Sequence, residues 1–284
     1  ADAAKDKANR IGQYIRVAKL GAGGMGEVWK AWDTELGRWA ALKFLKGHEA
    51  EDLPRFRREA QTAAKLIHPN IASVYGAHDD YIAMQYIEGH TLETFPRDDM
   101  RALVDAIRQA AVAVHFANEQ GIVHRDLKPA NIMVVGGKKA PTTRRVPGIP
   151  VAPKVHAYVM DFGLAKSMNV DSKLSVSGTI VGTPTYMSPE QAKGSRGVDH
   201  RTDVYSLGAT LYELLTNRPP FKDRDIYRLL KKIVELDAKP ARRVNPRIEE
   251  DLETIVMKCL EKDPERRYPS ALDLSEDLTR FLSG

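Results

Sequence analysis

Polar side chains suited to phosphoryl transfer gather in the run from His124 to Val135. Asp126 is a carboxylate that can accept a proton from an attacking hydroxyl, and Lys128 can neutralise charge on a moving phosphoryl group. Asn131 offers an amide oxygen to a hard cation such as Mg²⁺. The apolar residues that follow predict a buried strand. No one of the three groups is diagnostic alone, so the surrounding elements decide the interpretation.

A second carboxylate ends another apolar run. Asp161 follows Tyr158-Val159-Met160 and opens the tripeptide Asp161-Phe162-Gly163. A carboxylate at the end of a buried strand is well placed to bind a metal ion. Asp-Phe-Gly is also a common turn sequence. We interpret it as a metal site because it lies downstream of Asp126 and Asn131.

A glycine-rich run precedes these groups and has the pattern G-x-G-x-x-G, made by Gly21, Ala22, Gly23, Gly24, Met25 and Gly26. The pattern alone is weak, because dinucleotide-binding folds use the same string after a parallel strand and before a helix. Here residues 27–30 continue in an extended pattern. This favours a hairpin whose backbone amides approach phosphate oxygens without interference from Cβ atoms.

A lysine in the third predicted strand is a candidate phosphate ligand. Lys43 follows Ala41 and Leu42, and the alternation along the strand directs it towards a cleft. The ordinary alternative is a lysine that extends from a sheet edge into water. Glu59, in the next predicted helix, is available to pair with Lys43, and this favours the functional interpretation.

The elements that must position these residues fall into two groups. The alternation predicts three antiparallel strands in residues 14–45, and a helix and two further strands over residues 53–66, 71–75 and 81–87. Beyond Gly89 the spacing is helical, with helices expected over residues 100–120, 203–216, 225–236, 248–260 and 270–281. We therefore expect a β-rich small lobe, residues 11–88, a helical large lobe, residues 89–284, and a ligand cleft between them.

Composition and charge restrict the classes of function. The net charge of +5 over 284 residues comes mostly from basic residues interspersed with acids, which argues against nucleic-acid binding. The single cysteine, Cys259, excludes an internal disulfide framework and suits a reducing compartment. No apolar run reaches the roughly 20 residues of a membrane helix. We expect a cytoplasmic chain without membrane contact from this segment, and tethering by segments outside it stays open.

One segment has no periodicity. Residues 136–154 are rich in Gly, Pro, Lys and Arg and separate two apolar runs. We expect an exposed basic insertion.

In this order, the motifs resemble those of eukaryotic-like serine/threonine protein kinase catalytic domains, in the style of bacterial members. The resemblance covers about residues 11–282. It implies an α+β, two-lobed protein-kinase fold. The N-lobe would have a five-stranded antiparallel sheet and one main helix, and the C-lobe would be mostly α-helical.

The resemblance also assigns roles to residues. It implies ATP and Mg²⁺ or Mn²⁺ as cofactors, with Asp126 as the catalytic base and Lys128 as the contact to the γ-phosphate. Lys43 resembles the phosphate-anchoring lysine and Glu59 its helix partner, and Asn131 and Asp161 would be the metal ligands. Val28 and Ala41 resemble the roof of the adenine pocket and Met133 its floor, and Met84 resembles the residue that guards the back pocket. The implied nucleotide contacts are Gly21, Ala22, Gly23, Gly24, Gly26, Val28, Ala41, Lys43, Met84, Met133 and the backbone of Gln85 and Ile87.

Regulatory and structural positions follow from the same resemblance. Arg125 resembles the arginine that clamps a phosphorylated activation segment. The candidate regulatory hydroxyls are Thr179 first, then Ser175 and Ser177, together with Thr183 of the Gly-Thr-Pro motif. Glu190 resembles the acid that pairs with Arg267, and Asp203 resembles the buried anchor beneath the catalytic loop. Ser188 stands where many relatives have alanine, and Gln85 where glutamate is usual.

The implied function is transfer of the γ-phosphoryl group of MgATP to serine and threonine hydroxyls of proteins, including the chain's own activation segment. The implied partners are ATP and protein substrates, without nucleic acid, and homodimerisation stays open. The alternative is a nucleotide-binding pseudokinase scaffold, which should lack Lys43, Asp126 or Asp161. A nicotinamide-dependent dehydrogenase is not favoured, because the glycine-rich run lacks the parallel βαβ context of that class. The hydroxyl-rich residues 167–190 argue against a small-molecule kinase.

Overall fold

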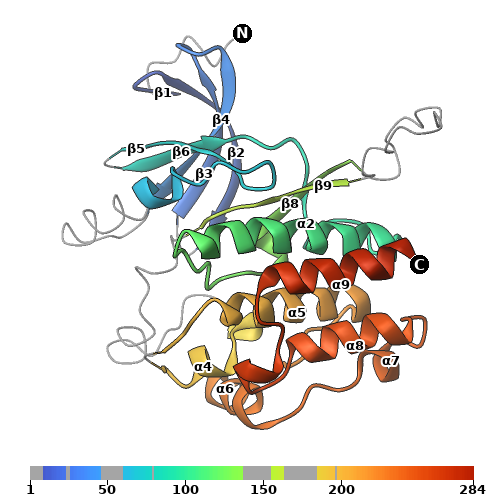
Figure 1. Cartoon of the computed structure of the whole chain (residues 1–284). Coiled ribbons are helices and arrows are strands. Elements are labelled where there is room, and N and C mark those ends of the chain that lie inside the picture. Colours follow the sequence, from blue (N-terminus) through green and yellow to red (C-terminus); the bar gives the residue numbers. More distant parts are fainter. Residues whose placement is uncertain are drawn as a thin grey trace, which may run out of the picture. The chain divides into compact units, whose positions relative to one another are not determined.

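The computed structural model describes residues 9–23, 26–45, 60–78, 80–136, 155–162, 184–195 and 197–284 (Figure 1). These residues fall into two compact units. Within the described part of the chain, the first unit lies in residues 1–88 apart from residues 69–71. Those three residues belong to the second unit, which continues from Gly89.

The first unit is built on one antiparallel sheet with the strand order β1-β2-β3-β4-β6-β5. Its strands are β1 (Arg10–Ile11), β2 (Tyr14–Gly23), β3 (Gly26–Asp33), β4 (Arg38–Leu45), β5 (Val74–Ala77) and β6 (Tyr81–Gln85). The five predicted strands are confirmed, but the expected strand number is wrong, because β1 adds a sixth. A two-residue strand is too short to show an alternating pattern. Of the predicted helix 53–66, residues 60–66 are described. Residues 60–63 are helical, and residues 64–66 are not, so the helix ends earlier than predicted.

The register of this sheet sorts its side chains onto two faces. One face carries a core cluster formed by Tyr14, Ala31, Ala40, Leu42, Tyr81 and Ala83. On the other face, β3 and β4 pair Val28 with Lys43, and Lys30 with Ala41. Because residues opposite one another share a face of the sheet, Val28, Ala41 and Lys43 lie together on this second face.

A smaller antiparallel sheet, in the order β7-β8-β9, belongs to the second unit. Its strands are β7 (His90–Thr91), β8 (Ile132–Gly136) and β9 (Val155–Val159). The β8–β9 ladder runs from the pair Ile132 and Val159 to the pair Gly136 and Val155. A Cβ on Gly89 would lie 2.4 Å from the carbonyl oxygen of Val134, so this approach of the backbone to β8 requires glycine.

The rest of the second unit is helical. It contains α2 (Met100–Glu119), η3 (Pro129–Asn131), η4 (Pro184–Tyr186), α4 (Pro189–Ala192), α5 (Arg201–Thr216), α6 (Ile226–Glu235), α7 (Ala241–Val244), α8 (Glu250–Cys259), η5 (Pro264–Arg266) and α9 (Ala271–Ser283). The five predicted helices are confirmed as α2, α5, α6, α8 and α9, with ends shifted by one or two residues. None of the described helices has the length and apolar character needed to cross a membrane.

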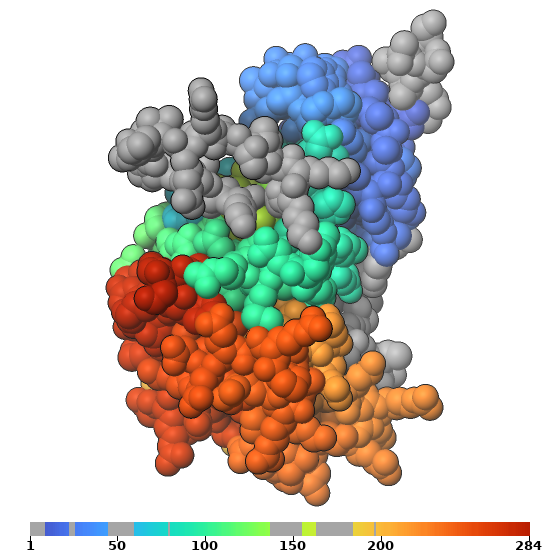
Figure 2. Space-filling model, turned by 90° about the vertical axis from the view of Figure 1, so that its right-hand side faces the viewer, coloured from blue at the N-terminus to red at the C-terminus, as the bar shows by residue number. Residues whose placement is uncertain are grey.

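Helix packing in this unit centres on α5, which is buried along nearly its whole length. A Cβ on Gly208 of α5 would lie 2.2 Å from the Cβ of Cys259, so the glycine lets α8 approach closely. Cys259 is fully buried there, and burial raises the pKa of its thiol. α9 lies along α2, and the C-terminal helices form one continuous surface, orange to red, in the space-filling view (Figure 1, Figure 2).

Candidate active site

Two polar groups of the predicted catalytic loop converge on the carboxylate of the third, Asp126. Nζ of Lys128 lies 2.7 Å from Oδ2 of Asp126. Nδ2 of Asn131 donates to the backbone oxygen of Asp126 at 2.7 Å and to Oδ2 at 3.1 Å. The short helix η3 begins at Pro129, whose fixed φ suits a first helical position, and its turn brings Asn131 back towards Asp126.

His124 joins this loop to the segment that carries Asp161. Its Nε2 lies 2.8 Å from the backbone oxygen of Met160, and its Nδ1 lies 3.3 Å from the backbone nitrogen of Asp126. A carbonyl oxygen only accepts and an amide N–H only donates, so the proton is on Nε2. The ring also meets Phe162 edge-on, with 4.7 Å between centroids. Sequence reasoning gave His124 no role, because its contacts with Met160 and Phe162 lie more than 30 residues away in the chain.

The two predicted metal ligands are brought to neighbouring backbone positions. Met160, which precedes Asp161, donates its N–H to the backbone oxygen of Asn131 at 2.9 Å. Both side-chain bonds from Asn131 to Asp126 use its nitrogen, so neither occupies its oxygen Oδ1. Within the described ranges, no three His, Cys, Asp or Glu side chains form a metal cluster. A carboxylate and an amide oxygen are nevertheless a suitable protein share for Mg²⁺, which takes its other ligands from water and substrate phosphates.

Asp203, on α5, holds the backbone of the catalytic loop. Its fully buried carboxylate accepts the N–H groups of His124 and Arg125, each at 2.9 Å, and the side-chain amide of Asn118 at 3.1 Å. Arg125 has φ 67° and Asp161 has φ 62°, a left-handed conformation that costs free energy for residues other than glycine. This geometry fits the prediction that Asp203 is a buried anchor for the loop.

Gln191 is a loop contact that sequence reasoning missed. Its Nε2 donates to the backbone oxygen of Arg125 at 3.0 Å, and its Oε1 accepts from the backbone of Ser188 at 3.0 Å. The spacing Ser-x-x-Gln is a capping-box signal that could have placed this pair at the start of α4. Ser188 is buried, and its Oγ lies 2.6 Å from Oγ1 of Thr202. A hydroxyl at position 188 thus has a specific partner.

Glu190 and Arg267 form a buried ion pair beside this network. Nη1 and Nη2 of Arg267 donate to the two carboxylate oxygens of Glu190 at 2.7 and 2.8 Å. Burial by itself would raise the pKa of Glu190, but the hydrogen bonds and charge of Arg267 outweigh it and lower that pKa. The geometry fits the pairing that the resemblance implied.

The nucleotide-contact candidates of the first unit lie on or beside the hairpin β2–β3 and strands β4 and β6. The glycine-rich run does form a hairpin, with Gly21 opposite Val28 and Gly23 opposite Gly26. Lys43 is buried at 8% exposure, and Met84 pairs with Ala41 across β4 and β6. Gln85 donates its backbone N–H to Ser73, and its side chain accepts from the same residue, so glutamine has a local partner here.

Several predicted residues lie outside the described part of the chain and stay predictions: Gly24, Glu59, Ser175, Ser177, Thr179 and Thr183. The basic insertion is likewise undescribed over residues 137–154. Ala22 is exposed on the hairpin. Met133 of β8 is half-buried and pairs with Thr91 and Tyr158.

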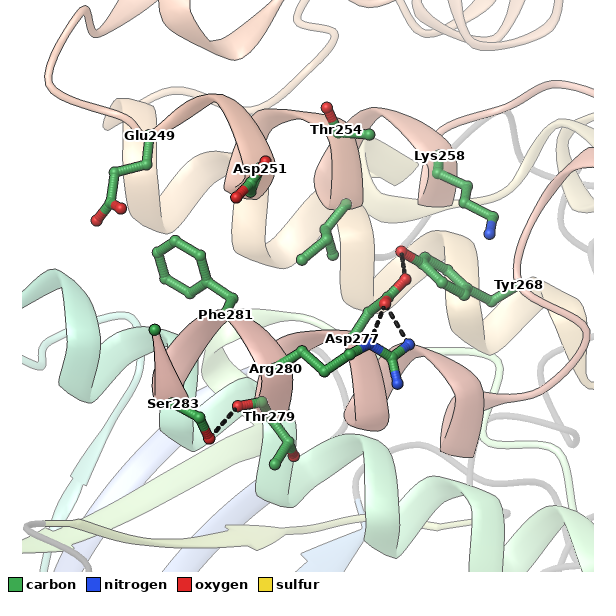
Figure 3. Close-up of a pocket in the computed structure, with 12 residues that line it drawn as sticks. Glu249, Asp251, Thr254, Lys258, Tyr268, Asp277, Thr279, Arg280, Phe281 and Ser283 are labelled. Atoms are coloured by element: carbon green, nitrogen blue, oxygen red, sulfur yellow. Dashed lines mark hydrogen bonds and ion pairs between the residues drawn. The ribbon is translucent and has the colours of Figure 1, made fainter.

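A pocket of about 740 Å³ lies elsewhere in the second unit, between α8 and α9 (Figure 3). In its lining, Asp277 accepts a hydrogen bond from Tyr268 at 2.6 Å and pairs with Arg280. Lys258 lies over the ring of Tyr268 at 4.1 Å. None of the predicted site residues lines this pocket, so it is not the candidate active site.

The chain matches known proteins along most of its length. The family model described as "Protein kinase domain" matches residues 14–277, and the chain belongs to this family, whose members use ATP and a divalent metal ion. It is 38% identical over 290 residues to the probable serine/threonine-protein kinase SCO3848 of Streptomyces coelicolor, covering 96% of this chain and 40% of that protein. It is 40% identical over 283 residues to the serine/threonine-protein kinase PknB of Mycobacterium tuberculosis, covering 93% and 42%.

The fold agrees with a solved kinase domain. The crystal structure of the Mycobacterium tuberculosis PknI kinase domain superposes with a TM-score of 0.70 at 25% identity, covering 95% of this chain and 97% of that one. The α+β protein-kinase fold expected from the sequence is therefore confirmed. The chain spans only 40% and 42% of the length of the two curated relatives.

Proposed function

We propose that the chain is the catalytic domain of a serine/threonine protein kinase that transfers the γ-phosphoryl group of MgATP to protein hydroxyls. The observation that carries this proposal is the convergence of Lys128 and Asn131 on the carboxylate of Asp126. A lysine two residues after the base is typical of serine/threonine kinases. A pseudokinase is not favoured, because Lys43, Asp126 and Asp161 are all present.

Asp126 is the proposed catalytic base. Its Oδ2 is held by Lys128 and Asn131, which leaves Oδ1 to take the proton of the substrate hydroxyl as the oxygen attacks phosphorus. Lys128 lies where its ammonium can move from the carboxylate to the developing charge on the γ-phosphoryl group. Positioning and charge neutralisation account for most of the catalysis of phosphoryl transfer, and this loop supplies both.

Asn131 and Asp161 are the proposed metal ligands. Mg²⁺ at these oxygens would neutralise phosphate charge and hold the phosphates in line with the attacking oxygen. The backbone hydrogen bond from Met160 to Asn131 joins the two segments that carry the proposed ligands.

Residues of the first unit are proposed to hold the rest of the nucleotide. Lys43, on the same sheet face as Val28 and Ala41, would contact the phosphates, with Glu59 as its ion-pair partner. Met84 and the backbone of Gln85 and Ile87 are the other proposed adenine contacts of this unit. Met133 stays a proposed adenine contact on the resemblance alone. The amides of Gly21, Ala22, Gly23, Gly24 and Gly26 would approach the phosphates.

Arg125 supports a proposal about regulation. Its Nε is buried and has no hydrogen-bond partner among the described residues. A phosphate on the activation segment could pair with this guanidinium and stabilise the strained loop next to the catalytic base. Thr179 is the first candidate, followed by Ser175, Ser177 and Thr183.

The test is phosphosite mapping by mass spectrometry after incubation with MgATP and a generic protein substrate. The matched control is Asp126→Asn, which keeps the shape of the side chain but cannot accept the proton. We expect phosphoserine or phosphothreonine in the wild-type sample only, with nucleotide binding retained in both proteins. Nucleotide binding without any phosphorylated residue in the wild-type sample would support the pseudokinase scaffold instead.

A further inference from the structure

A lysine of the first unit is held between two aromatic rings. Nζ of Lys30, on β3, lies 4.4 Å from the ring centroid of Trp39 on β4 and 4.2 Å from that of Tyr86, which follows β6. Trp39 in turn meets the ring of Trp32 edge-on, with 5.0 Å between centroids. We call Lys30, Trp39 and Tyr86 the lysine clamp.

The register places the lysine clamp on the sheet face that carries the proposed nucleotide contacts. Lys30 pairs with Ala41, and Ala41 pairs with Met84, so the three form one row across β3, β4 and β6. Val28 and Lys43 form the next row on the same face, two residues along each strand. The lysine clamp therefore lies on the same sheet face as the proposed nucleotide contacts, next to Ala41.

Tyr86 connects the clamp to the segment proposed to bind adenine. It lies between Gln85 and Ile87, whose backbones are the proposed adenine partners. Gln85 is the last residue of β6 and is fixed by bonds to Ser73. Tyr86 lies beyond the strand, where the ladder of backbone bonds has ended. The ring contact with Lys30 is a link from this residue back to the sheet.

We propose that Lys30 is a positioning residue for nucleotide binding: by holding Tyr86 against Trp39, its ammonium fixes the backbone that bonds adenine. This inference rests on the proposed kinase function and adds a residue to its nucleotide site. A group that positions the binding backbone, without touching the transferred phosphoryl group, acts on affinity and leaves the chemical step unchanged. Lys30 should therefore set the KM for ATP while kcat stays constant.

The experiment compares Lys30→Met with Lys30→Arg in the whole chain. Methionine keeps much of the length and apolar stem but removes the charge, whereas arginine keeps a cation that stacks on aromatic rings. The measurements are the Kd for a non-hydrolysable ATP analogue with Mg²⁺, by calorimetry, and KM and kcat for ATP. Lys65→Met, at an exposed lysine of the same unit, is the control for loss of one positive charge.

We expect Lys30→Met to raise Kd and KM about fivefold, the effect of losing a cation–aromatic contact of about 1 kcal/mol, with kcat unchanged. Lys30→Arg and Lys65→Met should match the wild type. Trp39→Leu should also weaken binding, and adding it to Lys30→Met should cause little further loss, because the contact between Lys30 and Trp39 is absent from both variants.

Unchanged nucleotide affinity in both Lys30→Met and Trp39→Leu would overturn the proposal. So would equal weakening in Lys30→Arg, because the effect would then depend on shape and not on charge. The measurement of Kd does not depend on catalytic turnover. An inactive wild type that binds the analogue would contradict the proposed kinase function, while the comparison of Kd values would still decide the role of Lys30.

Discussion

The carboxylate of Asp203 accepts the backbone N–H of Arg125 at 2.9 Å and thereby holds a residue whose φ is 67°. The same carboxylate binds the N–H of His124. A buried acid on α5 thus stabilises a loop conformation that is unfavourable by itself. The proposed catalytic base, Asp126, is the next residue, so its position depends on this bond.

Asp203→Asn should damage both the fold and the activity. The amide keeps one oxygen but points an NH₂ group at a backbone donor, which should lower the free energy of unfolding by about 2–4 kcal/mol. Displacement of the loop should lower kcat by about 100-fold. Chemical denaturation and steady-state kinetics measure the two effects. Asp273→Asn, which changes a carboxylate at the start of α9, is the control for the loss of one carboxylate. A fully active Asp203→Asn chain would contradict the anchoring role.

Lys128→Met should lower kcat by about 10²- to 10³-fold, as expected for the loss of one group that stabilises transition-state charge. KM for ATP should change little if, as proposed, the lysine stabilises the γ-phosphoryl group mainly in the transition state. Steady-state kinetics with a peptide substrate measures both values. A rise in KM with unchanged kcat would instead indicate that Lys128 binds the ground-state nucleotide.

Gln191→Glu should distinguish the hydrogen bonds that the side chain of Gln191 accepts from the one that it donates. The carboxylate still accepts hydrogen bonds from the backbone of Ser188 and from Thr202, but it cannot donate to the backbone oxygen of Arg125. We expect about a tenfold loss of kcat, equivalent to about 1.4 kcal/mol of transition-state stabilisation. The measurement is kcat with thermal unfolding as a check on folding. A large fall in Tm with normal kcat would show that Gln191 supports α4 only.

The ion pair of Glu190 and Arg267 should make stability depend on pH. The pKa of Glu190 is lowered in the folded chain, so its contribution is complete above the unfolded value of about 4.5 and is lost as pH falls through the folded value. Arg267→Met should lower the unfolding free energy by about 3–5 kcal/mol near neutral pH, because it leaves a buried charge without its partner. Denaturation curves from neutral to acid pH should converge for the two proteins.

The long elements, and the closeness of Asp126, Lys128 and Asn131, were predictable because their signals are local. Five strands and five helices repeat an apolar pattern over many residues, and Asp126, Lys128 and Asn131 lie within one short run. The strand β1 has only two residues and no such pattern. Gln191 reaches Arg125 across 66 positions, and Lys30 reaches Tyr86 through the strand register. Contacts of this kind become visible only when the elements are packed together.

The pair of Gly136 and Val155 closes the β8–β9 ladder at the base of the basic insertion. Gly136 and Val155, which flank residues 137–154 in the sequence, are therefore neighbours in the sheet. The entropic cost of closing a loop grows slowly with loop length, so the connection between β8 and β9 should tolerate an insertion. A reporter peptide or a small folded module inserted there should leave the catalytic loop in register, since β8 would keep its pairing with β9.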